Sequence, residues 1–308
     1  MSLAPALKPA LASALRELMA SDAADDSGPA ADIDTVTEIG GGSISRALLV
    51  GAGKRRWFVK VNDADLAEMF AAEADGLQAL AGCSALRVPR VVGHGVRGRQ
   101  AYLVLEYLRL HPLREPRDAA VAGRALAELH RVRGTQYGWQ RDNYIGSTPQ
   151  DNAWHQSWPK FFARRRLLPQ LTLAGRHGDH AGLIGGGERL LEKLDLLFAG
   201  YRPTASLLHG DLWYGNASTD ESGRLALFDP AVHFGDREAD LAMTELFGGF
   251  PDRFYAAYRE SWPLADGFAL RKTLYQLYHV LNHLNLFGSG YRRQAEAMIA
   301  TLLAALGG

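Results

Sequence analysis

The stretch "LLHGDLWYGNAS", residues 207–218, decides how this chain folds. An apolar run typical of a buried strand stops at His209, Gly210 and Asp211, and Asn216 follows five residues after the aspartate. A carboxylate placed beside a hydroxyl group accepts its proton, and the amide oxygen of an asparagine binds hard metal ions. The stretch therefore predicts a loop in which a base and a metal ligand lie together at the mouth of a strand.

Size and composition set the class of protein. A chain of 308 residues predicts about two lobes, and 47% hydrophobic with 22% charged residues is the composition of an ordinary soluble globular protein. Lys+Arg and Asp+Glu balance at 34 each, which argues against a binder of nucleic acid or of anionic membranes. The only cysteine is Cys83, and no run of eighteen apolar residues occurs. We expect a cytoplasmic protein.

The first 108 residues predict an arm followed by a small sheet. Leucines at positions 7, 11, 15 and 18 have the spacing of an amphipathic helix, so we assign residues 1–32 to this helix and a flexible acidic connector. Residues 33–108 predict a lobe with one helix over 66–80, ending in a connector near 106–112. The strands predicted in this lobe by alternation of apolar residues are 34–39, 45–50, 55–61, 88–95 and 101–108.

Residues 109–308 predict a larger, mainly helical lobe. Two short apolar runs, 206–208 and 225–228, interrupt the helices and predict a central hairpin. The fold class is therefore α+β, with a small antiparallel sheet beside a helical lobe. Helical spacing is found at 118–131, 155–168, 187–200, 252–261, 268–287 and 291–306.

Two features of the sheet lobe suit phosphate binding. The glycine cluster of "EIGGGSIS" lies between two predicted strands, and its backbone N–H groups are open to a phosphate, although such hairpins are more often only turns. Lys60 lies in the predicted strand 55–61, where a lysine normally points to water. Glu73, however, falls on the apolar face of the next helix and needs a partner, and Lys60 is the candidate.

Asp229 completes the set because it ends a second apolar run, where a carboxylate can bind a metal ion. The order glycine loop, lysine, glutamate, aspartate, asparagine, aspartate is that of the protein-kinase machinery for phosphoryl transfer, which needs phosphate anchoring, Mg²⁺ and a positioned hydroxyl. His209 is expected to support the loop. Asp240 is expected to cap the helix that follows it and to bond the loop backbone.

The motifs resemble those of the fructosamine (ketosamine) kinases, within the aminoglycoside-phosphotransferase-like group of the protein-kinase fold. The similar stretches, from Thr37 onward, include "GGGSIS", "FVKVN", "YLVLEYL", "LLHGDLWYGN", "DPAVHFGDREADLAMTELFGGF" and "LYHVLNHLNLFGSGY". The resemblance implies a bilobal protein-kinase-like fold. It also implies ATP-dependent phosphorylation, at O3, of a ketosamine, the rearranged adduct of a reducing sugar and an amine, in glycation repair.

The resemblance also implies individual roles. Asp211 matches the proton acceptor, Asn216 and Asp229 match the Mg²⁺ ligands, and Lys60 matches the phosphate anchor with Glu73 behind it. The other residues that it implies around ATP are Gly40, Gly41, Gly42 and Ser43 of the glycine loop and Glu106, Tyr107 and Leu108 of the hinge.

The substrate side leaves alternatives open. Trp213 packs either on a sugar or within the loop, and His283 is either a core histidine or a substrate contact. The implied substrate is a ketosamine, free or on protein lysines, for a monomer or weak dimer. A kinase of an aminoglycoside, choline or another metabolite ranks second because the C-terminal third has few clustered acids. A nucleotide-binding pseudokinase predicts the loss of catalytic residues that are present here.

Overall fold

Alternating apolar residues build a five-stranded antiparallel sheet in the first third of the chain, with the strand order β1-β2-β3-β5-β4. The computed structural model describes residues 8–23, 32–40, 44–178 and 181–307, so Gly41, Gly42 and Ser43 lie outside the described residues. All five predicted strands are confirmed, within a few residues at each end. They are β1 (Thr35–Ile39), β2 (Arg46–Ala52), β3 (Arg55–Asp63), β4 (Val91–Arg97) and β5 (Gln100–Glu106).

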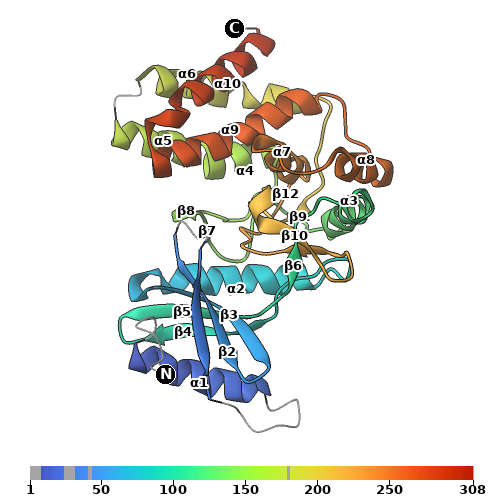
Figure 1. Ribbon diagram of the computed structural model, residues 1–308. Coiled ribbons are helices and arrows are strands. Elements are labelled where there is room, and N and C mark those ends of the chain that lie inside the picture. Colours follow the sequence, from blue (N-terminus) through green and yellow to red (C-terminus); the bar gives the residue numbers. More distant parts are fainter. Residues whose placement is uncertain (1–7, 24–31, 41–43, 179–180, 308) are drawn as a thin grey trace.

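A helix covers each face of this sheet (Figure 1). Along β5, Tyr102 and Val104 face one side and pack with Leu11 and Leu15 of α1 (Pro9–Ala23). Leu103, between them, faces the other side and packs with α2 (Ala67–Ala81). This division follows from the two-residue repeat of a strand. Both predicted helices are confirmed, and α1 is an integral layer of the sheet lobe.

The second lobe is mainly helical (Figure 1), and the predicted helices 252–261 and 268–287 are confirmed at both ends. A π-helical turn over Ala163–Leu167 joins two of its helices into one continuous rod. No helix in the described ranges is both long and apolar enough to cross a membrane. The helices are α3 (Pro116–His130), α4 (Trp158–Phe162), α5 (Leu168–His177), α6 (Ala181–Lys193), α7 (Glu238–Leu246), α8 (Asp252–Ser261), α9 (Phe268–Phe287) and α10 (Arg292–Ala305).

The prediction that runs 206–208 and 225–228 pair with each other as a hairpin is wrong. The first run pairs with a later strand, and the second pairs with the polar segment "ASTD" just before the turn. Three-residue runs carry too little pattern to select a partner, and "ASTD" has no apolar signature. The strands are β6 (Leu110–His111), β7 (Asn143–Ile145), β8 (Thr148–Gln150), β9 (Ser206–Leu208), β10 (Ala217–Asp220), β11 (Leu225–Leu227) and β12 (His233–Gly235).

Candidate active site

The pairing of β9 with β12 and of β10 with β11 brings two connecting loops together. One loop carries Asp211 and the other carries Asp229. The backbone N–H of Ala231 donates to the carbonyl of His209 at 2.8 Å. Gly210 has φ of 84°, and a Cβ there would lie 2.0 Å from the Ala231 carbonyl oxygen. Only glycine permits this approach, which explains why it stands between the histidine and the aspartate.

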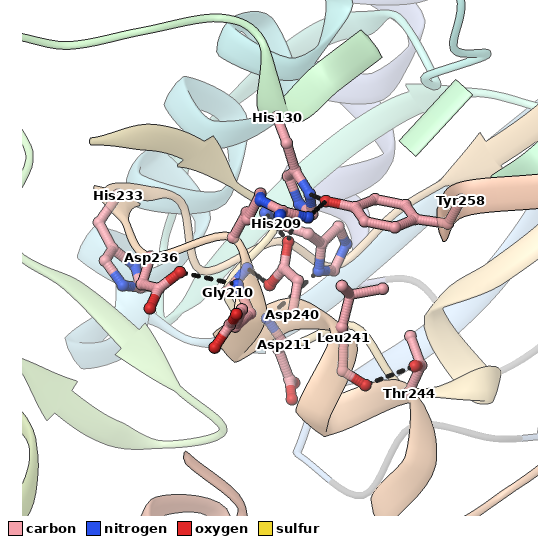
Figure 2. A network of polar contacts seen from close by, with 12 residues as sticks. His130, His209, Gly210, Asp211, His233, Asp236, Asp240, Leu241, Thr244 and Tyr258 are labelled. Carbon is pink, nitrogen blue, oxygen red and sulfur yellow. Dashed lines mark hydrogen bonds and ion pairs between the residues drawn. The ribbon is translucent and has the colours of Figure 1, made fainter. Parts of the chain in front are cut away.

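Buried polar groups hold the first loop in shape. The carboxylate of Asp240 accepts the backbone N–H groups of His209 at 2.7 Å and Gly210 at 2.9 Å, and it accepts the His130 ring at 3.2 Å (Figure 2). The expected bond to the loop backbone is confirmed. The expected helix cap is wrong, because Asp240 lies inside α7 and the carboxylate of Asp236 accepts the N–H of the first helical residue instead.

His209 supports the loop, as expected. Its Nε2–H donates to the carbonyl of Phe228 at 3.0 Å, and its Nδ1 accepts the backbone N–H of Asp211 at 3.3 Å. Burial lowers the pKa of this histidine, which suits the neutral ring that these two bonds require. Since both ring nitrogens are occupied by backbone groups, the histidine positions the neighbouring aspartate and is no base itself.

Asp211 and Asn216 lie side by side, as their spacing predicts. The Asn216 amide donates to the backbone carbonyl of Asp211 at 2.9 Å and to its Oδ2 at 3.4 Å, which leaves the asparagine Oδ1 on the other side of the amide. Burial, with the nearby charges of Asp229 and Asp240, raises the pKa of Asp211 to about 7. A carboxylate whose pKa lies near neutrality is suited to act as a general base.

The strand lysine makes the ion pair proposed for it. Lys60 Nζ lies 2.7 Å from Glu73 on α2 and 2.6 Å from Asp229. Burial alone would lower the pKa of Lys60, but the two carboxylates outweigh burial and the net shift is upward. The lysine therefore stays charged between the two lobes.

The backbone of Asp229 has φ of 57°, a left-handed conformation that costs about 1–3 kcal/mol in a non-glycine residue. Strain of this kind persists where the surroundings fix it. Here the carbonyl of Phe228 accepts from His209, and the N–H of Ala231 donates back to the same histidine. The Asp229 side chain is 45% exposed, so its carboxylate stays accessible to a ligand while it pairs with Lys60.

Apart from Lys60 and Glu73, the predicted ATP-binding residues that the structure describes lie at two places, the end of β1 and the hinge. Gly40, at the end of β1, is exposed, and an added Cβ would meet nothing within 4 Å, so space is open there. At the hinge, the Glu106 carboxylate forms an ion pair with Arg87. The backbone N–H of Glu106 donates to the backbone carbonyl of Arg90 at 2.9 Å. Tyr107 and Leu108 follow the end of β5, with Tyr107 exposed.

The donors near the two loops fit a magnesium ion. Within the described part of the chain, no three histidine, cysteine or acidic side chains gather as a metal site. Mg²⁺ in nucleotide sites needs fewer, because it is held by one or two protein oxygens together with phosphates and water. The partly exposed carboxylate of Asp229 and the amide oxygen of Asn216 are hard oxygen donors of this type.

Comparison with known proteins agrees with this geometry. A model of the fructosamine kinase family matches residues 16–305. A protein of Synechocystis assigned as a ketoamine kinase is 45% identical over 267 residues, which cover 86% of this chain and 89% of that protein. The chain belongs to the fructosamine kinase family. It is therefore a kinase, and the family match begins inside α1, which agrees with the packing of that helix on the sheet.

Two solved structures show how far the fold extends. The crystal structure of a protein assigned as a fructosamine-3-kinase from Haemophilus somnus is 30% identical, with a TM-score of 0.84 over 94% of this chain and 96% of that one. The crystal structure of an aminoglycoside phosphotransferase is 17% identical, with a TM-score of 0.59 over 90% of this chain and 95% of that one. The second likeness shows the fold alone, and together they confirm the bilobal, protein-kinase-like architecture.

In this fructosamine kinase family member, aromatic residues lie in and beside the loop that carries Asp211. Trp213 is 41% exposed and contacts Phe247, which is 44% exposed, with ring centroids 6.4 Å apart. Phe247 in turn contacts His283 on α9 at 4.9 Å. The His283 Nδ1 bonds a backbone carbonyl at 2.8 Å, and its ring is partly buried. Phe247 therefore links Trp213 and His283, the two residues that were expected on the substrate side, through ring contacts with both.

Sequence reasoning missed Phe247, which joins these two residues. It immediately follows α7 and precedes two glycines with φ of 70° and 100°, Gly248 and Gly249. The paired glycines of "FGGF" were the available signal, because left-handed glycines commonly follow the end of a helix and so mark the position of Phe247. Trp139 and Asp75, which connect the lobes, were also missed, since nothing local in the sequence pairs them.

Proposed function

We propose that this protein transfers the γ-phosphate of ATP to a sugar hydroxyl, the one on O3, of a ketosamine.

 The observation that carries the proposal is the position of Lys60, which reaches Glu73 and Asp229 at once, beside a loop where Asp211 and Asn216 are bonded to each other. Together with family membership, this set supports phosphoryl transfer.

In this proposal each side chain of the set has a defined role. The Asp211 carboxylate accepts the proton of the attacking hydroxyl, and Asn216 holds that carboxylate in place. The Lys60 ammonium binds phosphate oxygens, and Glu73 fixes its direction. Asp229 and Asn216 would hold Mg²⁺, which neutralises charge on the phosphates when bound. The pseudokinase alternative finds no support, because every member of the set is present and in place.

The aromatic residues beside the loop support a ketosamine as the acceptor. The exposed Trp213 ring can pack on the apolar face of a sugar, and Phe247 and His283 extend that surface away from the base. A ketosamine carries a protonated amine next to its sugar, and aromatic faces attract such a cation. The three described side chains that form this surface are aromatic, and none is acidic, which favours one amine over an aminoglycoside polycation.

A screen of acceptors tests the proposal. We expect phosphorylation of ribulose-, fructose- or erythrulose-derived amines with a kcat/KM at least tenfold above that for aminoglycosides or choline. ATP consumption measures the rates, and NMR of the product locates the phosphate, which we expect on O3. Omitting Mg²⁺ should abolish the reaction. Faster turnover of an aminoglycoside would overturn the assigned substrate class and leave the kinase chemistry intact.

Replacement of Trp213 by Ala tests the substrate surface. We expect the KM for the ketosamine to rise about tenfold, because loss of a stacking contact worth about 1.4 kcal/mol corresponds to that factor. The KM for ATP should stay within twofold, since Lys60 and Glu73 are untouched, and Trp213→Phe should recover most of the loss. An unchanged ketosamine KM in the alanine variant would assign the tryptophan to loop packing alone.

A further inference from the structure

A segment of the helical lobe holds α2 from the side opposite the phosphate anchor. Trp139 Nε1 donates to the carboxylate of Asp75 at 2.6 Å, and Gln140 donates to the same carboxylate at 2.9 Å. The next residue, Arg141, donates to the Ala71 carbonyl at 3.2 Å. It also pairs with Glu68 at 2.9 Å, and all these acceptors belong to α2. We call residues 139–141 the α2 clamp.

The acceptors share one face of the helix. Positions 68, 71 and 75 follow one another at three and four residues, so they lie in one row along α2. Glu73 precedes Asp75 by two residues, which at 3.6 residues per turn places it about 200° away around the helix. The helix is therefore held by Lys60 on one side and by the clamp on the other.

The clamp also connects to the segments around the catalytic loop. The Trp139 ring contacts Phe234 of β12, with centroids 5.5 Å apart, and β12 pairs with β9, the strand that leads into the loop. On α2 itself, a Cβ at Gly76 would lie 3.0 Å from Pro230, the residue after Asp229. The position of α2 is thus set by the same segments that set the base and the metal ligand.

We propose that the α2 clamp fixes the Lys60–Glu73 pair, with Trp139 and Asp75 as positioning residues for phosphate binding. The inference rests on the proposed function, in which Lys60 anchors the phosphates of ATP. Neither positioning residue touches Lys60; each acts through the placement of α2. The clamp belongs to the helical lobe and α2 to the sheet lobe. The clamp therefore fixes the position of the Lys60–Glu73 pair relative to the catalytic loop.

The test is a double-mutant cycle between Trp139→Phe and Glu73→Gln. Phenylalanine keeps an aromatic ring against Phe234 but removes the N–H donor to Asp75 together with one ring of the indole, a loss of ring area that the control below also carries. We expect the kcat/KM for ATP to fall about tenfold in Trp139→Phe, while the KM for the ketosamine stays within twofold. In the Glu73→Gln background, the same substitution should lower kcat/KM for ATP by less than twofold, because the pair that it positions is already broken.

The matched control is Trp154→Phe. Trp154 also stacks on Phe234, with centroids 6.3 Å apart, but no bond joins it to α2 in the described part of the chain. We expect its KM for ATP to stay within twofold of the wild-type value. Where Trp139→Phe does not fold, Gln140→Leu replaces it in the cycle, since it removes the second donor from an exposed residue. Its expected loss of kcat/KM for ATP is about threefold.

The outcomes separate the two proposals. Equal losses from Trp139→Phe in the wild-type and Glu73→Gln backgrounds would overturn the clamp, and so would a loss below twofold in the wild-type background. If Glu73→Gln by itself leaves kcat/KM for ATP at the wild-type value, the role that the proposed function gives to the Lys60–Glu73 pair is wrong. If Glu73→Gln is impaired and Trp139→Phe is not, the proposed function stands and only the clamp is lost.

Discussion

Replacing Asp211 by Asn is expected to lower kcat about a thousandfold while ATP binding stays close to wild type. A general base contributes about 10²–10⁴-fold to a rate, and an amide cannot accept the proton. Asparagine has nearly the same shape, and the 2.9 Å bond from Asn216 to the backbone carbonyl of residue 211 does not involve the side chain that changes. The loss should therefore fall on the chemical step.

Single-turnover measurement of phosphate transfer, with nucleotide affinity from calorimetry, checks this result. The control is Asp252→Asn, an exposed aspartate in the first turn of α8, for which we expect wild-type kinetics. If Asp211→Asn transferred phosphate at the wild-type rate, the base would have to be sought elsewhere. A large loss of ATP affinity would instead show that Asp211 acts on the nucleotide or its metal ion.

The sequence predicted the local parts of this site well. The long helix of residues 268–287 has a sustained apolar repeat, and the strand and helix that carry Lys60 and Glu73 were each defined by periodicity. The Lys60–Glu73 pair was also predictable, because a carboxylate on an apolar face needs a cation nearby. These features depend on residues whose environment is set by their own element.

Features that depend on contacts distant in the chain were not predictable in the same way. The partners of β9 and β11 are chosen by packing of the whole lobe, since runs of three residues carry almost no register information. The bond between Trp139 and Asp75 joins residues 64 positions apart, and neither has an unusual neighbour in sequence. The second contact of Lys60, to Asp229, appears only when the lobes meet.

Asp240 is a further example of a residue whose contacts distant in the chain were only partly predictable. Its bond to the loop backbone was expected from the sequence, but its bond to His130 was not. Its side chain is almost wholly buried and accepts three bonds, two from the backbone of the loop that carries Asp211 and one from His130. The His130 ring accepts from Tyr258 through Nδ1 at 2.8 Å, so Nε2–H is the donor to the aspartate (Figure 2). Burial favours protonation of Asp240, but these bonds outweigh it and the pKa is lowered.

Replacing Asp240 by Ala is therefore expected to lower the free energy of unfolding by about 3–5 kcal/mol, the usual cost of removing one partner from a buried charged network. The N–H groups of His209 and Gly210 would remain buried without an acceptor, each at a cost of about 1–3 kcal/mol. Asp240→Asn keeps one acceptor oxygen and should lose roughly half as much. Urea unfolding measures both values.

Activity distinguishes this support of the loop from a general loss of stability. Below the unfolding transition, Asp240→Ala should still lose most of its turnover, because the two amides that it releases belong to the residues that direct Asp211. Asp252→Ala, at an exposed position, should stay within about 0.5 kcal/mol of wild type and keep its activity. An Asp240→Ala variant that unfolds within 1 kcal/mol of wild type would mean that the loop amides find other acceptors, and the fixed geometry of the base would then need a different cause.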